Sequence, residues 1–178
     1  MGRDAIGREW QLATIQLDFN QPEGFGLTCI NEAGEKERIV MIHAAIMGSI
    51  DRFLSIYIEH TAGNFPVWLA PEQVRLITVS EDSVITTKAD DMRKQLKAAG
   101  IRTTIDDASE SVGKKIRLAS IAKIPYTLVI GEKEVNGNKV SPRLRGDLGD
   151  SEPTLEFNQF IEHLQQEINE RASHSSLK

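Results

Sequence analysis

Met41-Ile-His-Ala-Ala-Ile-Met-Gly-Ser-Ile-Asp-Arg-Phe53 is the stretch that decides the fold of this chain. Its apolar start predicts the end of a strand, and His43 stands where the pattern changes. Apolar residues then recur at helical spacing, at Ile46, Ile50, Phe53, Leu54 and Tyr57. The pattern predicts an amphipathic helix over about residues 45–61, which Gly63-Asn-Phe-Pro66 ends.

The residues before this stretch, about 8–42, have the pattern of strands. Apolar positions alternate from Trp10 to Phe19. The turn cluster Asn31–Gly34 separates two further apolar segments, Phe25–Ile30 and Arg38–Ile42, which predicts a hairpin. The exposed edges of such strands would invite pairing with another chain, so we expect self-association or local disorder in residues 1–62.

The residues after Pro71 alternate between strand and helix patterns. Strands are predicted at Val74–Val79, Ile101–Ile105, Tyr126–Ile130 and Lys139–Leu144, and helices at Asp82–Ala99, Ser109–Lys123 and Pro153–Arg171, with a hairpin turn at Val135–Asn138. The order predicts an α/β fold with a mixed, mostly parallel sheet flanked by helices. We expect four parts: a first domain at 1–62, a connector at 63–71, a second domain at 72–171 and a frayed tail at 172–178.

Composition narrows the functional classes. The chain has 178 residues, 40% of them hydrophobic, and no apolar run approaches the roughly 18–20 residues that a membrane span needs. Its single cysteine, Cys29, excludes an internal disulfide and is typical of a cytoplasmic protein. The net charge of −5 disfavours non-specific binding of nucleic acid. Residues 107–145 nevertheless hold eight Lys or Arg against four Asp or Glu, a net of +4; charge alone favours a solvated face.

Four motifs resemble those of the threonyl-tRNA synthetases, a family of class II aminoacyl-tRNA synthetases. They are Gly7-Arg-Glu-Trp-Gln-Leu-Ala-Thr-Ile-Gln-Leu-Asp-Phe19, residues 41–53, Phe65-Pro-Val-Trp-Leu-Ala-Pro71 and Gly131-Glu-Lys-Glu-Val135. The resemblance runs from Gly7 to about Glu170 and implies a C-terminal portion: the end of the catalytic domain, with motif 3, followed by the anticodon-binding domain. The intact enzymes are homodimers that activate threonine with ATP and attach it to threonine tRNA. The chain has no candidate for motifs 1 or 2, so we expect it to be inactive alone.

The resemblance assigns roles to residues of the first domain. Arg52 corresponds to the catalytic, ATP-contacting arginine of motif 3, and a guanidinium suits phosphate oxygens. Gln11, Thr14, Gln16 and Ser49 correspond to substrate-binding positions, and His43 to one of three zinc ligands, the other two being upstream in the family. Without the resemblance, the pattern favours a surface ion-pair role for Arg52 beside Asp51. It favours a core position for His43. Ala44, Leu12 and Ala13 depart from the family pattern, and we expect neither ATP nor zinc to bind this chain tightly.

The second domain contains the residues expected to bind the anticodon. Gly131–Val135 and Val140–Arg145 resemble the anticodon-reading hairpin of the family, which implies roles for Ser109, Arg117, Lys133, Glu134 and Arg143. Unpaired anticodon bases expose edges that carboxylates and guanidinium groups can read. Ala108-Ser109 replaces the Arg-Asn of many relatives. The expected partners are the anticodon stem-loop of threonine tRNA and the rest of a synthetase chain, with no membrane.

Two alternatives remain open at this point. One is a stand-alone, non-catalytic RNA-binding module derived from such an enzyme. The other is a small nucleotide-binding α/β domain, which is weakened because Gly113-Lys114-Lys115 lacks the upstream glycine of a phosphate-binding loop and is followed by Ile116 and Arg117.

Overall fold

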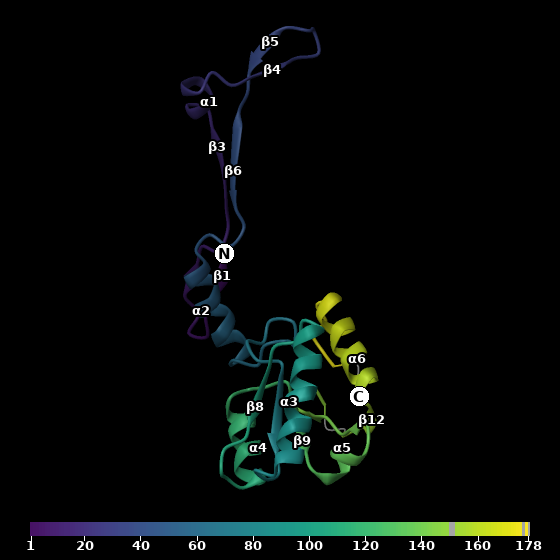
Figure 1. The fold of residues 1–178 in the computed structure, drawn as a ribbon. Helices are drawn as coiled ribbons and strands as arrows, with labels where there is room; N and C mark the ends of the chain where they lie inside the picture. Colours follow the sequence, from purple (N-terminus) through teal and green to yellow (C-terminus); the bar gives the residue numbers. More distant parts are fainter. Residues whose placement is uncertain (150–151, 176, 178) are drawn as a thin grey trace. The chain divides into compact units, whose positions relative to one another are not determined.

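Two units make up the chain, Met1–Ala62 and Gly63–Lys178, in a computed structural model that describes residues 1–149, 152–175 and 177 (Figure 1). Burial differs sharply between them. Within the described residues, the buried apolar core begins at Val67 and lies wholly in the second unit, whereas the first unit buries only Asp4 and Pro22. No described helix combines the length and the apolar character that a membrane span requires.

The first unit is built from short antiparallel pairs and one helix. Strand β1 (Gly2–Arg3) pairs with β2 (Glu9–Trp10), β3 (Thr14–Asp18) with β6 (Met41–Ala45), and β4 (Thr28–Ile30) with β5 (Lys36–Arg38). A short helix not expected from the sequence, α1 (Gln21–Gly24), follows β3. Helix α2 (Ile50–Thr61) begins later than expected because β6 continues to Ala45 and Ser49 caps the helix. Gly48 turns the chain between them with φ of 59°, and a Cβ there would lie 2.9 Å from the Leu12 carbonyl oxygen.

The β3–β6 ribbon leaves apolar side chains uncovered. Leu17 faces Ile42 across the ribbon, two residues along from Ile15, and these three side chains are 61%, 64% and 76% exposed. A two-stranded sheet without a covering layer is at best marginally stable in water. The first unit therefore has the surface of a sheet fragment that buries no apolar core of its own.

The second unit is a four-stranded sheet in the order β11-β9-β7-β8. Strands β7 (Val74–Thr78), β8 (Thr103–Asp106) and β9 (Tyr126–Ile130) are parallel, and β11 (Arg143–Leu144) is antiparallel to β9. Right-handed crossovers place α3 (Ser83–Ala98) and α4 (Val112–Ile121) on opposite faces, because the chain steps from β7 to β8 and then back past β7 to β9. The predicted α/β class, with a mixed and mostly parallel sheet flanked by helices, is confirmed.

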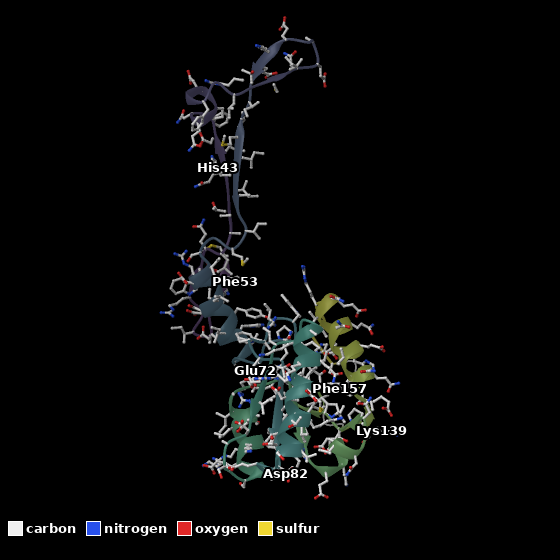
Figure 2. The ribbon with its side chains drawn as sticks, viewed as in Figure 1. His43, Phe53, Glu72, Asp82, Lys139 and Phe157 are labelled. Atoms are coloured by element: carbon white, nitrogen blue, oxygen red, sulfur yellow. The ribbon has the colours of Figure 1, made fainter. Side chains whose placement is uncertain are left out.

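The core lies mainly between the sheet and two of its helices. Helix α3 buries Ile85, Ala89, Met92 and Leu96, while α6 (Phe157–Asn169) buries Phe157, Phe160 and Leu164. Figure 2 shows Phe157 at the start of α6, and shows Glu72 and Asp82 at opposite ends of β7. The Asp82 end is therefore the carboxyl edge of the three parallel strands.

The predicted hairpin turn at Val135–Asn138 is wrong. Residues Glu132–Asn136 form a short helix, α5, whose first turn is closed by the Gly131 N–H donating to Glu134 Oε2 at 3.0 Å. The strand that follows, β10 (Lys139–Val140), pairs with β12 (Leu155–Glu156). Only β11 returns beside β9, so the expected strand Lys139–Leu144 is divided between two sheets.

Two other boundaries differ from the expectations. Helix α4 begins at Val112 rather than Ser109, because the Ser111 hydroxyl accepts from the Lys114 N–H. In the tail expected to fray, Ser175 and Leu177 are buried. The Ser175 hydroxyl lies 2.6 Å from the Tyr126 hydroxyl and donates to the buried Glu167 at 3.1 Å, which attaches the tail to the core.

The segment expected as a connector, 63–71, is an integral part of the second unit. Val67 is buried, and its carbonyl accepts from Gln73 Nε2 at 2.8 Å. The Arg102 guanidinium donates to the Trp68 and Ala70 carbonyls at 2.8–2.9 Å. The guanidinium of Arg145 donates to the Phe65 and Lys123 carbonyls at 2.8 Å. These bonds to charged donors anchor the segment to the sheet domain.

Candidate functional site

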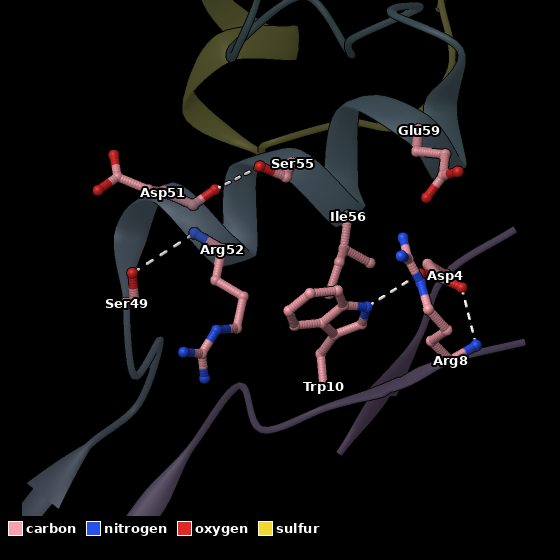
Figure 3. Close-up of a pocket in the computed structure, with 9 residues that line it drawn as sticks. All are labelled: Asp4, Arg8, Trp10, Ser49, Asp51, Arg52, Ser55, Ile56 and Glu59. Atoms are coloured by element: carbon pink, nitrogen blue, oxygen red, sulfur yellow. Dashed lines mark hydrogen bonds and ion pairs between the residues drawn. The ribbon is translucent and has the colours of Figure 1, made fainter. Parts of the chain in front are cut away.

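A pocket of about 490 Å³ opens beside Trp10 in the first unit (Figure 3). Residues of α2 form one wall, and the β1–β2 hairpin and its turn form the other. The lining residues are Asp4, Arg8, Trp10, Ser49, Asp51, Arg52, Ser55, Ile56 and Glu59. Three carboxylates and two guanidinium groups therefore line the pocket around one indole ring.

Arg52 lies in this pocket on the first turn of α2. Its guanidinium carbon is 5.8 Å from the centre of the Trp10 ring, and Nη1 donates to the Gln11 carbonyl at 3.2 Å. Ser49 caps the same turn by accepting from the Arg52 N–H at 3.5 Å. The surface ion pair that Arg52 would form without the resemblance is absent among the described residues, so no carboxylate of the pocket occupies the guanidinium.

Asp4 is the centre of the opposite wall. Its carboxylate accepts from Trp10 Nε1 at 2.9 Å, from Arg8 Nε at 2.6 Å, and from the Arg8 and Ile6 N–H groups. The hydrogen bond from Trp10 is the largest influence and, with those from Arg8, lowers the pKa of Asp4 to about 2 against the effect of burial. Asp4 is therefore ionised at neutral pH and fixes the orientation of the indole.

The predicted substrate-binding residues fall in two places. Gln11 and Ser49 lie with Arg52, as described above. Gln16, on β3, is the cross-strand partner of His43 on β6, and both line a second hollow of about 640 Å³. Thr14 lies between the two sites, half-buried, and lines neither.

His43 does not form a metal site with the other described residues. Its Nε2 lies 2.9 Å from Asp18 Oδ2. The pKa of Asp18 is lowered first by the hydrogen bond from the Gln21 N–H and then by His43. The part of the chain that the structure describes contains no group of three metal-ligating side chains. One imidazole and one carboxylate do not fit a tetrahedral zinc centre.

A crevice of about 490 Å³ lies at the carboxyl edge of the sheet in the second unit. It opens between the loop after β7 and the loop after β8, which lead to helices on opposite faces. Open α/β sheets bind ligands at such a switch point. Its lining residues are Val79, Ser80, Glu81, Ala108, Ser109, Glu110, Ser111 and Lys115. Of the predicted anticodon-binding residues, the crevice contains Ser109.

The other four predicted anticodon-binding residues are distributed around this edge and beyond it. Lys133 and Glu134 lie on α5, which begins at the carboxyl end of β9, and Arg117 is exposed on α4. Arg143 lies on β11 opposite Thr127, roughly 13 Å from Gly131 along β9. It pairs with Glu152 at 3.1 Å. The structure thus brings Ser109, Lys133 and Glu134 to one edge and places Arg143 on the sheet.

The basic window of residues 107–145 carries less available charge than the sequence indicates. Lys115 is buried and donates to the Thr78 carbonyl at 3.0 Å, and Arg145 is buried as described above. Lys114 pairs with Glu110 at 2.5 Å. Four cations of the window are exposed and have no ion pair within the described ranges: Arg117, Lys123, Lys133 and Lys139.

Sequence reasoning missed several residues of both sites. The sequence gives no signal for Asp4 or Trp10, although Trp10 lies inside the first of the four motifs, because their contact depends on a turn that no local pattern reveals. Ser80 and Glu81 were also missed. Their position directly after a predicted parallel strand is a signal that could have identified them.

Two family models match the chain, one in each unit. Residues 73–167 match the model described as "Anticodon binding domain". Residues 2–61 match the model described as "tRNA synthetase class II core domain (G, H, P, S and T)". The first match covers more than half of the chain and coincides with the sheet, α3–α5 and most of α6.

Curated relatives are threonine–tRNA ligases. The ligase of Clostridium tetani is 46% identical over 176 residues, which are 98% of this chain and 27% of that protein. The ligase of Carboxydothermus hydrogenoformans is 48% identical over 171 residues, 95% of this chain and 26% of that protein. The chain thus spans about a quarter of the length of these relatives.

Solved structures that resemble this chain also include threonyl-tRNA synthetases. The RNA binding domain of threonyl-tRNA synthetase from Cryptosporidium parvum Iowa II superposes with a TM-score of 0.80 at 33% identity, over 92% of this chain and 40% of that one. A putative threonyl-tRNA synthetase from Aeropyrum pernix has a TM-score of 0.64 at 26% identity, over 98% of this chain and 42% of that one.

Proposed function

Since the chain belongs to the threonyl-tRNA synthetase family and corresponds to a C-terminal portion of its members, we propose that residues 63–178 bind the anticodon stem-loop of threonine tRNA. The observation that carries the proposal is the match of residues 73–167, which include the sheet, α3–α5 and most of α6, to the anticodon-binding family. The crevice at the carboxyl edge supports it, because it is polar and lies where α/β sheets bind ligands.

The chemistry of this edge suits an unpaired base. Ser109 offers a hydroxyl that both donates and accepts, and Glu134 Oε1 is an acceptor next to the oxygen that holds Gly131. Lys133 and Arg117 are exposed cations that attract phosphate. In the proposed complex Ser109 and Glu134 read base edges, Lys133 and Arg117 contact bases and phosphates, and Arg143 contacts a nucleotide lying across the sheet.

Residues 1–62 supply the end of a class II catalytic core in this proposal. Arg52 contacts ATP, while Gln11, Thr14, Gln16 and Ser49 lie on the threonine and adenylate side. His43 would contribute one of three zinc ligands in a longer, homodimeric and cytoplasmic enzyme. The uncovered apolar face of the β3–β6 ribbon fits this role, because further strands of a larger sheet would cover it. The isolated chain should therefore not activate threonine.

The test of the proposal is binding of the purified chain to two fluorescent RNA hairpins, measured by anisotropy at several salt concentrations. One hairpin carries the anticodon stem-loop of threonine tRNA, and the other has the middle anticodon base changed. We expect tighter binding of the first at every salt concentration. Equal binding of both would reduce the interaction to non-specific electrostatics and refute anticodon recognition.

The catalytic part has a separate test. Threonine-dependent exchange of pyrophosphate into ATP should be absent when only this chain is present. Exchange above background would contradict the proposal that the remaining catalytic core is required, and would identify residues 1–62 as a self-sufficient activating centre.

A further inference from the structure

Arg52 is held by uncharged partners although carboxylates line the same pocket. Its guanidinium faces the Trp10 ring and donates to the Gln11 carbonyl, whereas none of the described carboxylates, including Asp51 and Glu59, forms an ion pair with it. Figure 3 shows the guanidinium beside the indole and turned away from Asp51. An ion pair would neutralise the charge, but an aromatic face and one carbonyl only orient it.

The ring that orients Arg52 is itself fixed. Trp10 Nε1 donates to Asp4, and the Asp4 carboxylate is held in turn by three N–H groups from Arg8 and Ile6. Arg8 lies over the same ring, with its guanidinium carbon 5.3 Å from the centroid. The indole is therefore restrained through both its edge and its face, and does not simply fill space.

We propose that Trp10 is a positioning residue for Arg52: the indole, anchored by Asp4, holds the guanidinium at the pocket with most of its N–H donors free for a phosphate-bearing ligand. A guanidinium has five N–H donors, and the Gln11 carbonyl uses one. The inference rests on the proposed contact of Arg52 with ATP. The inference adds a second residue, Trp10, which contacts the arginine and does not contact the ligand.

The first test is spectroscopic and needs no ligand. In the full chain labelled with ¹⁵N at arginine Nε, the Arg52 signal, assigned with Arg52→Lys, should be shifted by the ring current of Trp10. Trp10→Leu should move the signal to an ordinary arginine position, and Trp10→Phe should restore part of the shift. The matched control is Trp68→Leu, which removes the other tryptophan from the second unit and should leave the Arg52 signal unchanged.

The second test uses millimolar ATP as the probe and follows the same signal. ATP should displace the Arg52 signal in the unmutated chain. Trp10→Leu should weaken the apparent affinity about two- to fivefold, as loss of an exposed cation–π contact predicts, and Trp10→Phe should recover most of it. If Trp10 had a purely structural role, the ATP affinity that Trp10→Phe restores would not be in proportion to the ring-current shift that it restores.

Three results would overturn the inference: an Arg52 signal without a ring-current shift, a shift that survives Trp10→Leu, or an ATP response that Trp10→Leu leaves unchanged. Absence of any ATP response in the unmutated chain would overturn its ligand-binding part. These failures are distinguishable from failure of the anticodon proposal, because stem-loop binding is measured separately and Trp10→Leu should not change it.

Discussion

Replacing Glu134 with Gln should reduce base discrimination while the fold remains intact. Glu134 Oε2 accepts the Gly131 N–H at 3.0 Å, and within the described residues Oε1 has no partner. In Glu134→Gln the amide oxygen can keep the bond to Gly131. The amide NH₂ group then replaces Oε1, so a donor faces the base where an acceptor is required.

The magnitude follows from these two bonds. A good side-chain contact to a base contributes about 1–3 kcal/mol to discrimination, or about 5- to 150-fold in relative affinity. Loss of a helix cap costs about 0.5–2 kcal/mol of stability. Glu134→Gln should therefore lose the contribution to base discrimination and keep the stability that the helix cap provides. Glu134→Ala should lose both and therefore melt at a lower temperature.

The assay compares the two hairpins for each variant by anisotropy, together with thermal melting by circular dichroism. Glu132→Gln is the matched control, since it removes the same charge from an exposed position in the same turn of α5 without touching the cap. It should strengthen binding of both hairpins slightly and leave their ratio unchanged. Unchanged discrimination in Glu134→Gln, or an equal loss in the control, would refute the assignment of Glu134 as a base reader.

Four further outcomes follow from the contacts described above. A fragment of residues 72–171 should melt below one of 63–178, because it lacks the anchored segment and the buried end of the tail; equal melting temperatures would contradict this. Because the pKa of Asp4 is lowered to about 2, its contribution to stability is present above about pH 4 and is lost as pH falls through 2; indole fluorescence that changes between pH 7 and 5 would argue against it. Burial, then the charge of Glu167, raises the pKa of Tyr126 above its usual value of 10.0, so stability falls as pH rises beyond that value. With the other tyrosine replaced by phenylalanine, absorbance at 295 nm near pH 11 should stay low until the protein unfolds. Arg117→Ala should weaken both hairpins, flatten the salt dependence by about one unit and reduce discrimination less than Glu134→Gln does; an unchanged salt dependence would contradict the phosphate contact.

Elements whose signals are local were predictable from the sequence. The apolar run Tyr126–Ile130 has the bounds of β9, and the helix expected at Asp82–Ala99 lies within one residue of α3 at each end. Asp82 caps α3 by accepting from the Val84 N–H, and such a cap can be read from neighbouring residues. Features decided by contacts between neighbours in sequence are thus recovered well.

Features that depend on competition between local signals, or on contacts between residues distant in sequence, could not be predicted from the sequence. The Asn136-Gly137 signal favours a turn, but the Glu134 carboxylate stabilises a helix there instead. Lys115 and Arg145 look like solvated charges, and their burial depends on carbonyls 37 and 80 residues away, at Thr78 and Phe65. For the candidate site, the resemblance indicated Arg52, Gln11 and Ser49, which the structure brings together, but no pattern indicated the indole that holds the arginine.

The burial of Lys115 has a consequence for chemical footprinting. Lys114 and Lys115 are adjacent, yet the side chain of Lys114 is 53% exposed whereas Lys115 is 2% exposed with its ammonium group bonded to a backbone carbonyl. An amine-reactive reagent should modify the first and spare the second in the free protein. A lack of labelling at Lys115 in the presence of RNA therefore carries no information about contact. Only the neighbouring lysine reports whether RNA covers this end of α4.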